Sequence, residues 1–416
     1  MTTSSRIGLF ITLLMINAAG LRAQDTVPVV PQPVPVVPAI ENSLARPLVN
    51  GKQVITVLLP LYLDSAFDGG GQYRFGKQFP KYLLPGLEFY EGVQLAIDSL
   101  RKEKVPLDIR IVDTRKMKSV YDLLKTPDIT EAHLLLAEVA NNEIRALADY
   151  ANKNQIPFIN VNLPNDGGIT NNPYMVILNS TLMTHCEGIY KYLQKNYSGQ
   201  LITVFRKAGA QEDRLKTYFS TIEKSTLGTP AKLRWVNLPS TFTVDDLTPY
   251  LDSTKKMNVV LAGSLDEQFA RNLCTQLASV RKSYPIQVMG MPTWDAIKDF
   301  EKKDFKDLEI LYTTPFNPLR TDPLSISLLD YFKNNLYARP TDMVFRGYET
   351  LYRYGKLLHE LGPNIASGLG EGKYKLFTDY NIQPVLLNNQ QQQLDYFENK
   401  KIYVVKLLNG VVSTIF

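Results

Sequence analysis

The chain has little cysteine and little histidine, and both shortages limit its chemistry. It contains two cysteines and three histidines among 416 residues. Two cysteines cannot build a disulfide framework, so we expect Cys186 and Cys274 to be buried free thiols, with one disulfide in an oxidising compartment as the alternative. His133, His185 and His359 stand at no spacing that makes a metal site, so no metal is expected.

Sequence motifs for nucleophilic catalysis and for phosphate binding are also missing. No G-x-S-x-G pattern occurs. The glycines of "SGLGEGKY" fail the phosphate-loop pattern, because Ser367 occupies the place of its first glycine and Tyr374 that of its Ser/Thr. We therefore expect no catalytic residue and no cofactor, and the chain is not predicted to be an enzyme.

A strong net charge and a long apolar run are absent too. The formal net charge is +5, from 46 basic and 41 acidic residues, which is too mild to predict a nucleic-acid partner. The apolar run from Ile7 to Leu21 is shorter than the roughly 18 residues of a membrane span, so no stable membrane insertion is expected.

The beginning of the chain has the pattern of a secretory signal. Arg6 precedes the apolar run, and Leu21-Arg22-Ala23 approximates a cleavage site, so residues 1–23 are predicted to be a cleavable signal peptide, with an uncleaved anchor as the alternative. Residues 24–50 follow as a linker, since "PVVPQPVPVVP" favours an extended polyproline II conformation. The remaining globular part is longer than one core usually serves, so two lobes are expected.

From Val54 onward, apolar runs of strand length alternate with segments of helical periodicity. The predicted strands are residues 54–60, 107–113, 132–138, 156–161, 174–179, 201–206, 231–237, 257–263, 285–290 and 308–314. In residues 85–103, apolar residues recur at spacings of three and four, and residues 341–361 do the same after the N-cap candidate Thr341. This alternation predicts an α/β fold with parallel sheets that are covered by helices on both faces.

Two interruptions and the tail depart from this alternation. Turn-forming residues near 170–180 predict a hinge before a helix that starts at Ser180 or Thr181, and three prolines within residues 313–325 predict a crossing back. Two lobes that are joined by several crossings form a hinged cleft. Residues 393–416 predict an antiparallel meander of three strands.

The order and spacing of these parts resemble the type I periplasmic binding protein family, which includes branched-chain amino acid binding proteins. The resemblance rests on "ITVLLPL" followed by "YEGVQLAIDSL", on "LDIRIVDT", on "ALADYANKNQIPFINV" and on "FRGYETLYRYGKLL". It implies two Rossmann-like lobes with parallel sheets joined by a hinge, and a periplasmic location. It also implies that residues 51–175 and 313–362 form lobe 1 and that residues 176–312 and 363–416 form lobe 2.

In such a fold the ligand lies outside the carboxyl ends of the strands, between the lobes. The polar and aromatic residues at these ends are the predicted ligand-binding set: Asp64, Glu138, Asn141, Asn160, Asn162, Arg206, Ser264, Asp266, Thr293 and Trp294. Arg206 with Lys207 suits an acidic ligand, with a solvated loop as the alternative. Trp294 suits stacking on a planar ligand, with core packing as the alternative.

Two features depart from amino-acid-binding members of the family. Those members place small hydroxyl residues after the third and fourth strands, where this chain has "AEVANNE" and "NVNLPND", which argues against an α-amino-acid ligand. The first loop, residues 64–86, is unusually long and is either a functional lid or disordered.

Two functions remain open from the sequence. The first is a solute-binding protein that captures a small polar ligand in an interlobe cleft and passes it to an ABC transporter permease. The alternative is a ligand-free envelope scaffold or regulator with an envelope protein as its partner, as the outer-membrane activators of peptidoglycan synthases are with a related fold.

Overall fold

The computed structural model describes residues 46–388 and 393–416. The predicted signal peptide, residues 1–23, and nearly all of the predicted linker, residues 24–50, lie outside the described residues.

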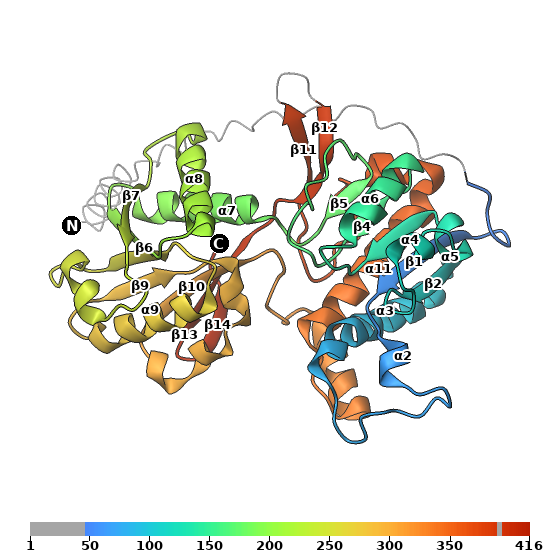
Figure 1. Cartoon of the computed structure of the whole chain (residues 1–416), viewed down its shortest axis with the longest axis horizontal. Coiled ribbons are helices and arrows are strands. Elements are labelled where there is room, and N and C mark those ends of the chain that lie inside the picture. Colours follow the sequence, from blue (N-terminus) through green and yellow to red (C-terminus); the bar gives the residue numbers. More distant parts are fainter. Residues whose placement is uncertain (1–45, 389–392) are drawn as a thin grey trace, which may run out of the picture. The chain divides into compact units, whose positions relative to one another are not determined.

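The described chain forms two seven-stranded sheets (Figure 1). The first sheet has the order β11-β12-β5-β4-β3-β1-β2, and the second has the order β14-β13-β10-β9-β8-β6-β7. The strands are β1 (Gln53–Leu59), β2 (Leu107–Asp113), β3 (Leu134–Ala137), β4 (Phe158–Asn160), β5 (Met175–Ile177), β6 (Leu201–Arg206), β7 (Lys232–Asn237), β8 (Asn258–Ala262), β9 (Ile286–Met289), β10 (Glu309–Thr314), β11 (Ile382–Asn388), β12 (Gln393–Asn399), β13 (Tyr403–Leu408) and β14 (Val411–Thr414).

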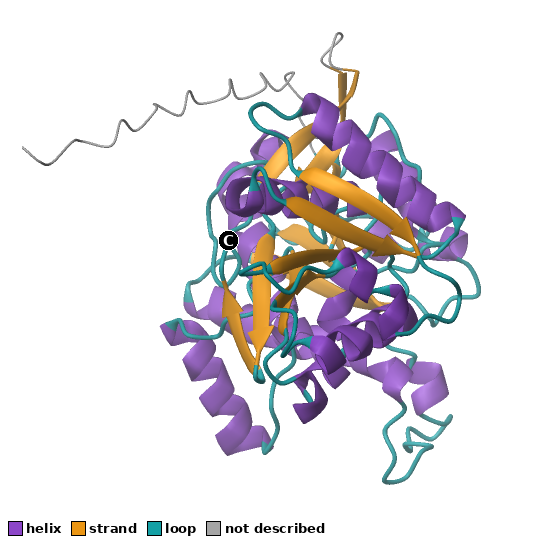
Figure 2. Cartoon of the chain, turned by 90° about the vertical axis from the view of Figure 1, so that its left-hand side faces the viewer, coloured by secondary structure: helices purple, strands orange, loops and turns teal. Residues whose placement is uncertain are grey.

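Helices lie on both faces of these strands (Figure 2). The α-helices are α2 (Leu63–Ala66), α3 (Leu84–Lys102), α4 (Val120–Leu123), α5 (Pro127–Thr130), α6 (Ile144–Lys153), α7 (Leu182–Tyr197), α8 (Ala210–Ser225), α9 (Glu267–Val280), α10 (Pro323–Tyr331) and α11 (Asp342–Leu361). The short 3-10 helices are η2 (Lys81–Leu83), η3 (Val244–Asp246), η4 (Thr248–Tyr250), η5 (Pro292–Ala296), η6 (Lys298–Glu301), η7 (Lys303–Phe305) and η9 (Gly362–Gly368), and η8 (Phe332–Leu336) is a π-helical turn.

The first ten strands confirm the predicted alternation of strands and helices. Strands β1 to β5 and β6 to β10 take the same spatial order, 2-1-3-4-5, and every pairing among them is parallel. Parallel strands need a crossover between them, and the intervening helical segments supply it. Each set of five parallel strands, with the helices that cover it, is therefore the centre of one α/β lobe.

The predicted C-terminal meander is half confirmed, since β13 and β14 form its second antiparallel hairpin, but its first strand does not pair with β13. Strand β12 pairs in parallel with β5 and antiparallel with β11 in the first sheet, whereas β13 and β14 join the second sheet beside β10. Residues 363–399 therefore run with the first sheet, although the sequence placed 363–416 in lobe 2. Since β12 lies in the first sheet and β13 in the second, residues 400–402 are a crossing between sheets rather than a hairpin turn. Strand β12 is almost wholly buried in its place beside β5.

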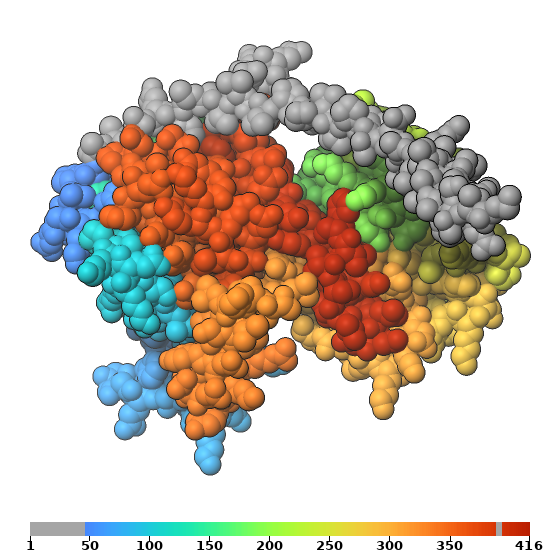
Figure 3. All heavy atoms as spheres, turned by 180° about the vertical axis from the view of Figure 1, so that it is seen from behind, coloured from blue at the N-terminus to red at the C-terminus, as the bar shows by residue number. Residues whose placement is uncertain are grey.

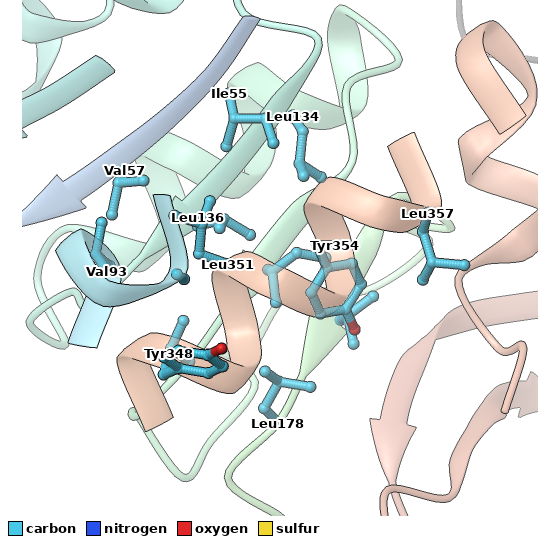
Figure 4. Packing of buried hydrophobic residues seen from close by; sticks show 14 of the residues in the cluster. Ile55, Val57, Val93, Leu134, Leu136, Leu178, Tyr348, Leu351, Tyr354 and Leu357 are labelled. Carbon is cyan, nitrogen blue, oxygen red and sulfur yellow. The ribbon is translucent and has the colours of Figure 1, made fainter. Parts of the chain in front are cut away.

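Each sheet carries a hydrophobic core on both of its faces. Alternate side chains of β1 point to opposite faces, so Val57 packs toward α3 and α11 while Leu58 packs toward α6. Figure 4 shows Val57 beside Val93 of α3, and Leu136 beside Leu351 of α11. Cys186 and Cys274 are buried and free, as expected, because they lie in different cores of the second lobe.

Helices α3 and α11 approach each other closely at two glycines. A Cβ atom on Gly92 would lie 2.0 Å from the carbonyl oxygen of Val344, and one on Gly347 would lie 2.2 Å from that of Phe89. Both obstructing atoms belong to the backbone, so they cannot move aside as a flexible side chain does. The Thr341 hydroxyl, which was predicted to cap α11, donates instead to Glu88 Oε2 of α3 at 2.8 Å.

We expect Gly92→Ala to lower the free energy of unfolding by roughly 3 kcal/mol, because the added methyl group forces the two helix backbones apart. Chemical denaturation of the purified variant measures this change. Gly372→Ala is the matched control, since only the Lys375 side chain lies near its Cβ position. Equal losses in the two variants would contradict the close contact of α3 with α11.

Candidate functional site

The chain passes between the two sheets three times, and one side chain bonds to all three segments. The crossings are residues 178–181, 315–322 and 400–402. The fully buried Asn399 donates through Nδ2 to the carbonyl oxygens of Leu178, at 3.2 Å, and Pro315, at 3.3 Å. Its own carbonyl oxygen accepts from the Ser180 hydroxyl at 2.5 Å, and its Oδ1 accepts from the amide N–H of Lys401 at 3.1 Å. The three crossings are therefore held at one point.

An ion pair between the buried Glu398 and the partly exposed Lys400 reinforces the same region. Glu398 accepts from the amide N–H of Thr181 at 2.7 Å, and Lys400 Nζ bonds both Glu398 Oε2, at 2.5 Å, and the Thr184 hydroxyl, at 2.8 Å. Burial opposes ionisation of Glu398, but the neighbouring Lys400 ammonium outweighs it, so the pKa of Glu398 is lowered. Glu398 is therefore charged at neutral pH and anchors the start of α7.

A cavity of about 580 Å³ adjoins these crossings and is lined by residues of both lobes. One wall consists of residues 179–183 and 313–316, which belong to two of the crossings and their neighbours. The other walls come from residues 164–166, which follow β4, from residues 292, 293, 295 and 296 after β9, and from Arg346 of α11. The carboxyl ends of the strands thus contribute to the cavity, as the resemblance to periplasmic binding proteins implied.

Arg346 is the principal cation of this cavity in the first lobe. Its Nη1 donates to Asn162 Oδ1 at 2.8 Å, and its guanidinium carbon lies 3.7 Å from the centre of the Phe316 ring. Burial lowers the pKa of this guanidinium, although Asp342 and Asp295 oppose the shift. No carboxylate of the described residues lies within 4 Å of it as an ion-pair partner.

The second lobe supplies an acid to the same cavity. Burial raises the pKa of Asp295, although the Arg346 charge and a hydrogen bond with Tyr312 oppose this shift. On the crossing side, His185 Nδ1 lies 2.9 Å from the Thr313 hydroxyl, and burial lowers the pKa of His185 to about 4. The imidazole is therefore neutral at pH 7 and serves as a hydrogen-bonding group.

Three residues of the predicted ligand-binding set lie at or beside this cavity. Thr293 lines it, with its hydroxyl donating to the carbonyl oxygen of Leu265 at 3.1 Å. Asn162 orients Arg346. Asn160 is fully buried and folds the loop that follows it, because its side chain bonds both the N–H and the C=O of Leu163. That loop continues into residues 164–166 of the cavity wall.

Four predicted residues serve the architecture of the second lobe instead. Trp294 is 1% exposed and packs against Phe300 in the core, so it does not stack on a ligand, and the core-packing alternative describes it. Arg206 is buried and pairs with Asp213 Oδ1 at 2.5 Å, which makes it neither a ligand contact nor part of a solvated loop. Ser264 is buried and donates to Glu212 Oε1 at 2.6 Å.

Asp266, the fourth of these, caps helix α9. Its Oδ1 accepts from the amide N–H of Phe269 at 2.8 Å, and its Oδ2 accepts from Lys207 Nζ at 2.5 Å. Asp266 and Lys207 line a hollow of about 750 Å³ whose residues all belong to the second lobe. They do not line the cavity at the crossings.

The remaining predicted residues lie at the carboxyl edge of the first sheet. Asp64 and Asn141 are exposed, and neither lines the cavity. Glu138 is 7% exposed, and its Oε2 has no hydrogen-bond partner among the described residues. Burial raises the pKa of Glu138 to about 7, although the charges of Arg346 and Arg115 oppose this shift.

The first loop, residues 64–86, is ordered by local contacts and contributes nothing to the cavity. Asp113 Oδ1 and Oδ2 accept from the backbone N–H groups of residues 61–63, which fixes the start of the loop. The Tyr73 ring then contacts the rings of Phe67 and Phe79. Figure 3 shows this loop, in light blue, projecting from the first lobe beside the orange segment that includes α10 and η8.

Sequence reasoning missed Arg346 and Asp295. Arg346 occupies a position on an amphipathic helix where a charged residue normally faces solvent, so no pattern marked it. Asp295 lies six residues after the last residue of β9, Met289, in the segment "GMPTWDAI" of residues 290–297. Its position at a strand end was a usable signal, but the adjacent Trp294 was chosen instead.

The sequence matches no family model and no curated protein. Its structure is similar to several solved ones. A branched-chain amino acid ABC transporter periplasmic ligand-binding protein from Burkholderia xenovorans has a TM-score of 0.60 at 13% identity, with 88% of this chain and 95% of that one covered. An ABC transporter substrate-binding protein from Desulfitobacterium hafniense in complex with Leu has a TM-score of 0.57 at 12% identity, with 88% and 100% covered.

Full-length LpoA from Haemophilus influenzae is also similar, with a TM-score of 0.53 at 14% identity, and 90% of this chain matches 60% of that one. At these identities the likeness establishes the fold. The chain therefore has the two α/β lobes of a type I periplasmic binding protein fold, as the sequence predicted.

Over residues 46–388 and 393–416, no helix is long and apolar enough to span a bilayer. In the same part of the chain, no group of three or more His, Cys, Asp or Glu side chains is arranged to hold a metal ion.

We expect Asn399→Ala to lower the free energy of unfolding by about 2–4 kcal/mol, because it leaves the carbonyl groups of two crossings buried without their donor. Urea denaturation measures the loss. Asn364→Ala, at an exposed position in η9, is the control and should change stability by less than about 0.5 kcal/mol. A neutral Asn399 variant would contradict the role of this amide in joining the crossings.

Because the pKa of Glu138 is raised, we expect the free energy of unfolding to depend on pH. Its pKa is raised from 4.5 to about 7, so between these values the folded protein holds a proton that the unfolded chain has released. The free energy of unfolding therefore falls as pH rises through this interval. Glu138→Gln removes the titrating group, so the variant should gain stability relative to wild type by on the order of 2 kcal/mol from about pH 5 to about pH 8.

Denaturation curves over this pH range test the prediction. Glu301→Gln is the matched control, because that carboxylate is exposed and should leave the pH profile of wild type unchanged. Parallel profiles for wild type and Glu138→Gln would show that Glu138 titrates normally.

Proposed function

We propose that the protein is a periplasmic solute-binding protein that captures a small polar ligand in the cavity at the crossings. The observation that carries this proposal is the composition of the cavity wall. Both lobes contribute polar groups to one space of about 580 Å³, and two of the three crossings pass along it. A ligand in this space contacts both lobes at once, which is the arrangement that couples binding to hinge closure.

Capture requires no chemistry beyond hydrogen bonding and charge pairing. Thr293 and Asp295 approach the cavity from the second lobe, and Arg346 approaches it from the first. A ligand that bonds to both sets favours the closed arrangement by its differential affinity, and the crossings tied by Asn399 act as the hinge. The protein is accordingly proposed to be a binding protein rather than an enzyme.

Location and partner belong to the same proposal. The predicted signal peptide supports export to the periplasm, and the likeness to ABC transporter substrate-binding proteins supports delivery of the ligand to a transporter permease. These neighbours bind or are named for amino acids, but the strand-end residues of this chain differ from the pattern of amino-acid-binding members.

A second candidate function is an envelope scaffold that acts through protein contacts. It is favoured by the first loop and the neighbouring segment, which expose several large hydrophobic side chains: Leu63, Phe67, Phe79, Tyr82, Ile326, Tyr331, Leu336 and Tyr337. The structural likeness to LpoA is consistent with this candidate. The two functions differ in whether the cavity is used.

A thermal-shift screen with organic acids, sugars, nucleobases and peptidoglycan fragments tests the proposal. A ligand at a hundred times its dissociation constant should add about 2.7 kcal/mol to the free energy of unfolding. The variant Thr293→Phe narrows the cavity and should abolish the shift, whereas Thr275→Phe, on the exposed side of α9, should retain it. Stabilisation that persists in Thr293→Phe, or no stabilisation by any compound, would favour the scaffold.

A further inference from the structure

The exposed hydrophobic side chains of the protein are concentrated in a small part of its surface. In the described part of the chain, nineteen large hydrophobic side chains are exposed, and ten of them lie in three short segments, residues 63–82, 116–121 and 326–339. Tyr82 is 47% exposed and Tyr337 is 91% exposed. Scattered single residues would need no explanation, whereas a concentration of this kind marks a surface that another body covers.

Two of these segments lie at the same end of the first lobe. Helices α3 and α11 run in parallel, because Glu88 accepts from the Thr341 hydroxyl near their starts and Glu103 pairs with Lys356 near their ends. One segment precedes α3 and the other precedes α11, so both reach the helices from the same side. Figures 1 and 3 show the two segments side by side, the first in blue and the second in orange.

The third segment, residues 116–121, adjoins the beginning of the first. The guanidinium carbon of Arg115 lies 5.6 Å from the centre of the Tyr62 ring. The neighbouring Asp113 accepts hydrogen bonds from the backbone N–H groups of residues 61–63. The three segments therefore belong to one end of the first lobe, and we call them together the tip surface.

The tip surface is positively charged. Its three segments contain seven basic and three acidic residues, a net charge of +4, whereas the whole chain carries +5. All seven basic side chains are exposed, and none of them forms an ion pair among the described residues. These cations are therefore available to an anionic partner.

The apolar side chains of the tip surface are held outward by the fold. Tyr337 ends η8 with a φ of 51°, a left-handed conformation in which Gly or Asn is usual, so the turn itself does not call for a large ring. In the first loop, the Tyr73 ring stacks on Phe79 at 6.1 Å, and Asp68 Oδ1 accepts from two backbone N–H groups of its own turn. An ordered surface loses little conformational entropy when it docks.

This combination suits a lipid bilayer better than a protein. Five of the seven basic residues are lysines, and lysine is depleted in protein interfaces. At a bilayer surface, tyrosine rings settle at the level of the headgroups, and lysine and arginine are attracted to anionic lipids. No helix of residues 46–388 and 393–416 can span a bilayer, so the contact expected of these residues is peripheral.

We propose that the tip surface docks on a bilayer that contains anionic lipids, with its tyrosine and aliphatic side chains among the headgroups and its lysines against the lipid charges. None of the three segments lines the cavity at the crossings, so this inference goes beyond solute capture and does not depend on it. It also gives the exposed side chains a different partner from that of the scaffold candidate.

Co-sedimentation with vesicles of phosphatidylglycerol and phosphatidylethanolamine tests the proposal, and vesicles of phosphatidylcholine are the control. The protein is purified after export, and all variants share its N-terminus. We expect it to bind the anionic vesicles at least about tenfold more tightly at low than at high ionic strength, because salt screens exposed charges. Binding to phosphatidylcholine should be weaker than to the anionic vesicles at either ionic strength.

Paired substitutions assign the binding to the tip surface. Lys77→Gln with Lys81→Gln should lower the partition coefficient by about 25-fold, since each charge near an anionic surface contributes about fivefold. Lys255→Gln with Lys256→Gln removes the same charge from an exposed turn of the second lobe and should change it less than about twofold.

The apolar contact has its own variants. Tyr337→Ser should weaken binding by about fivefold, whereas Leu227→Ser, at an 84% exposed position of the second lobe, should not. In Tyr82→Trp, brominated acyl chains should quench the added fluorescence when the vesicles are anionic. Leu227→Trp is the control and should not be quenched, and the two native tryptophans are the same in both proteins.

Every result bears on the lipid contact alone. No binding to anionic vesicles overturns it and leaves the tip surface to a protein partner, as in the scaffold candidate. Equal losses in the two lysine pairs indicate adsorption by net charge, which also overturns it. The same holds if Tyr337→Ser binds normally and Tyr82→Trp is not quenched. The thermal-shift screen of the cavity judges solute binding separately.

Discussion

The buried side-chain amide of Asn399 constrains the three segments by which the chain passes between its sheets. The segments that connect two lobes leave their strands, so their backbone N–H and C=O groups no longer have hydrogen-bond partners in the sheet. Asn399 replaces those partners with its own donors and acceptor, and the Glu398–Lys400 pair fixes the adjacent start of α7. The same residues end β12, so the crossings are held together by a strand that belongs to the first sheet.

The cavity follows from this arrangement. Its wall includes two of the crossings and the strand ends beside them, and it brings Asp295 of the second lobe and Arg346 of the first lobe into one space. These opposite charges share the cavity without forming a direct ion pair. The two residues that hold Arg346 in place are Asn162 of the first lobe, through a hydrogen bond, and Phe316 of a crossing, through its ring. Under the proposed solute-binding function, binding and bending are linked through the same few residues.

Much of the fold could be predicted from the sequence, whereas little of the site could. The ten parallel strands, α3, α6 and α11 follow from runs and periods that report burial directly. The positions of Asn160, Asn162 and Thr293 at or beside the cavity follow from the sequence, because polar residues at parallel strand ends converge. Trp294 and Arg206 were misjudged, because position at a strand end does not reveal whether a side chain turns toward the cavity or back into the lobe.

By itself the sequence determined which segments are strands and helices, the parallel order of the first ten strands and the presence of two lobes, because local periodicity records which faces are buried. The tertiary structure decided the partner of β12 and the role of Arg346. A strand with a buried pattern can join either sheet, and only the free edge at β5 selects one. A helical arginine normally faces solvent, and only Phe316 and Asn162, far away in the sequence, turn it into a donor in a shared cavity.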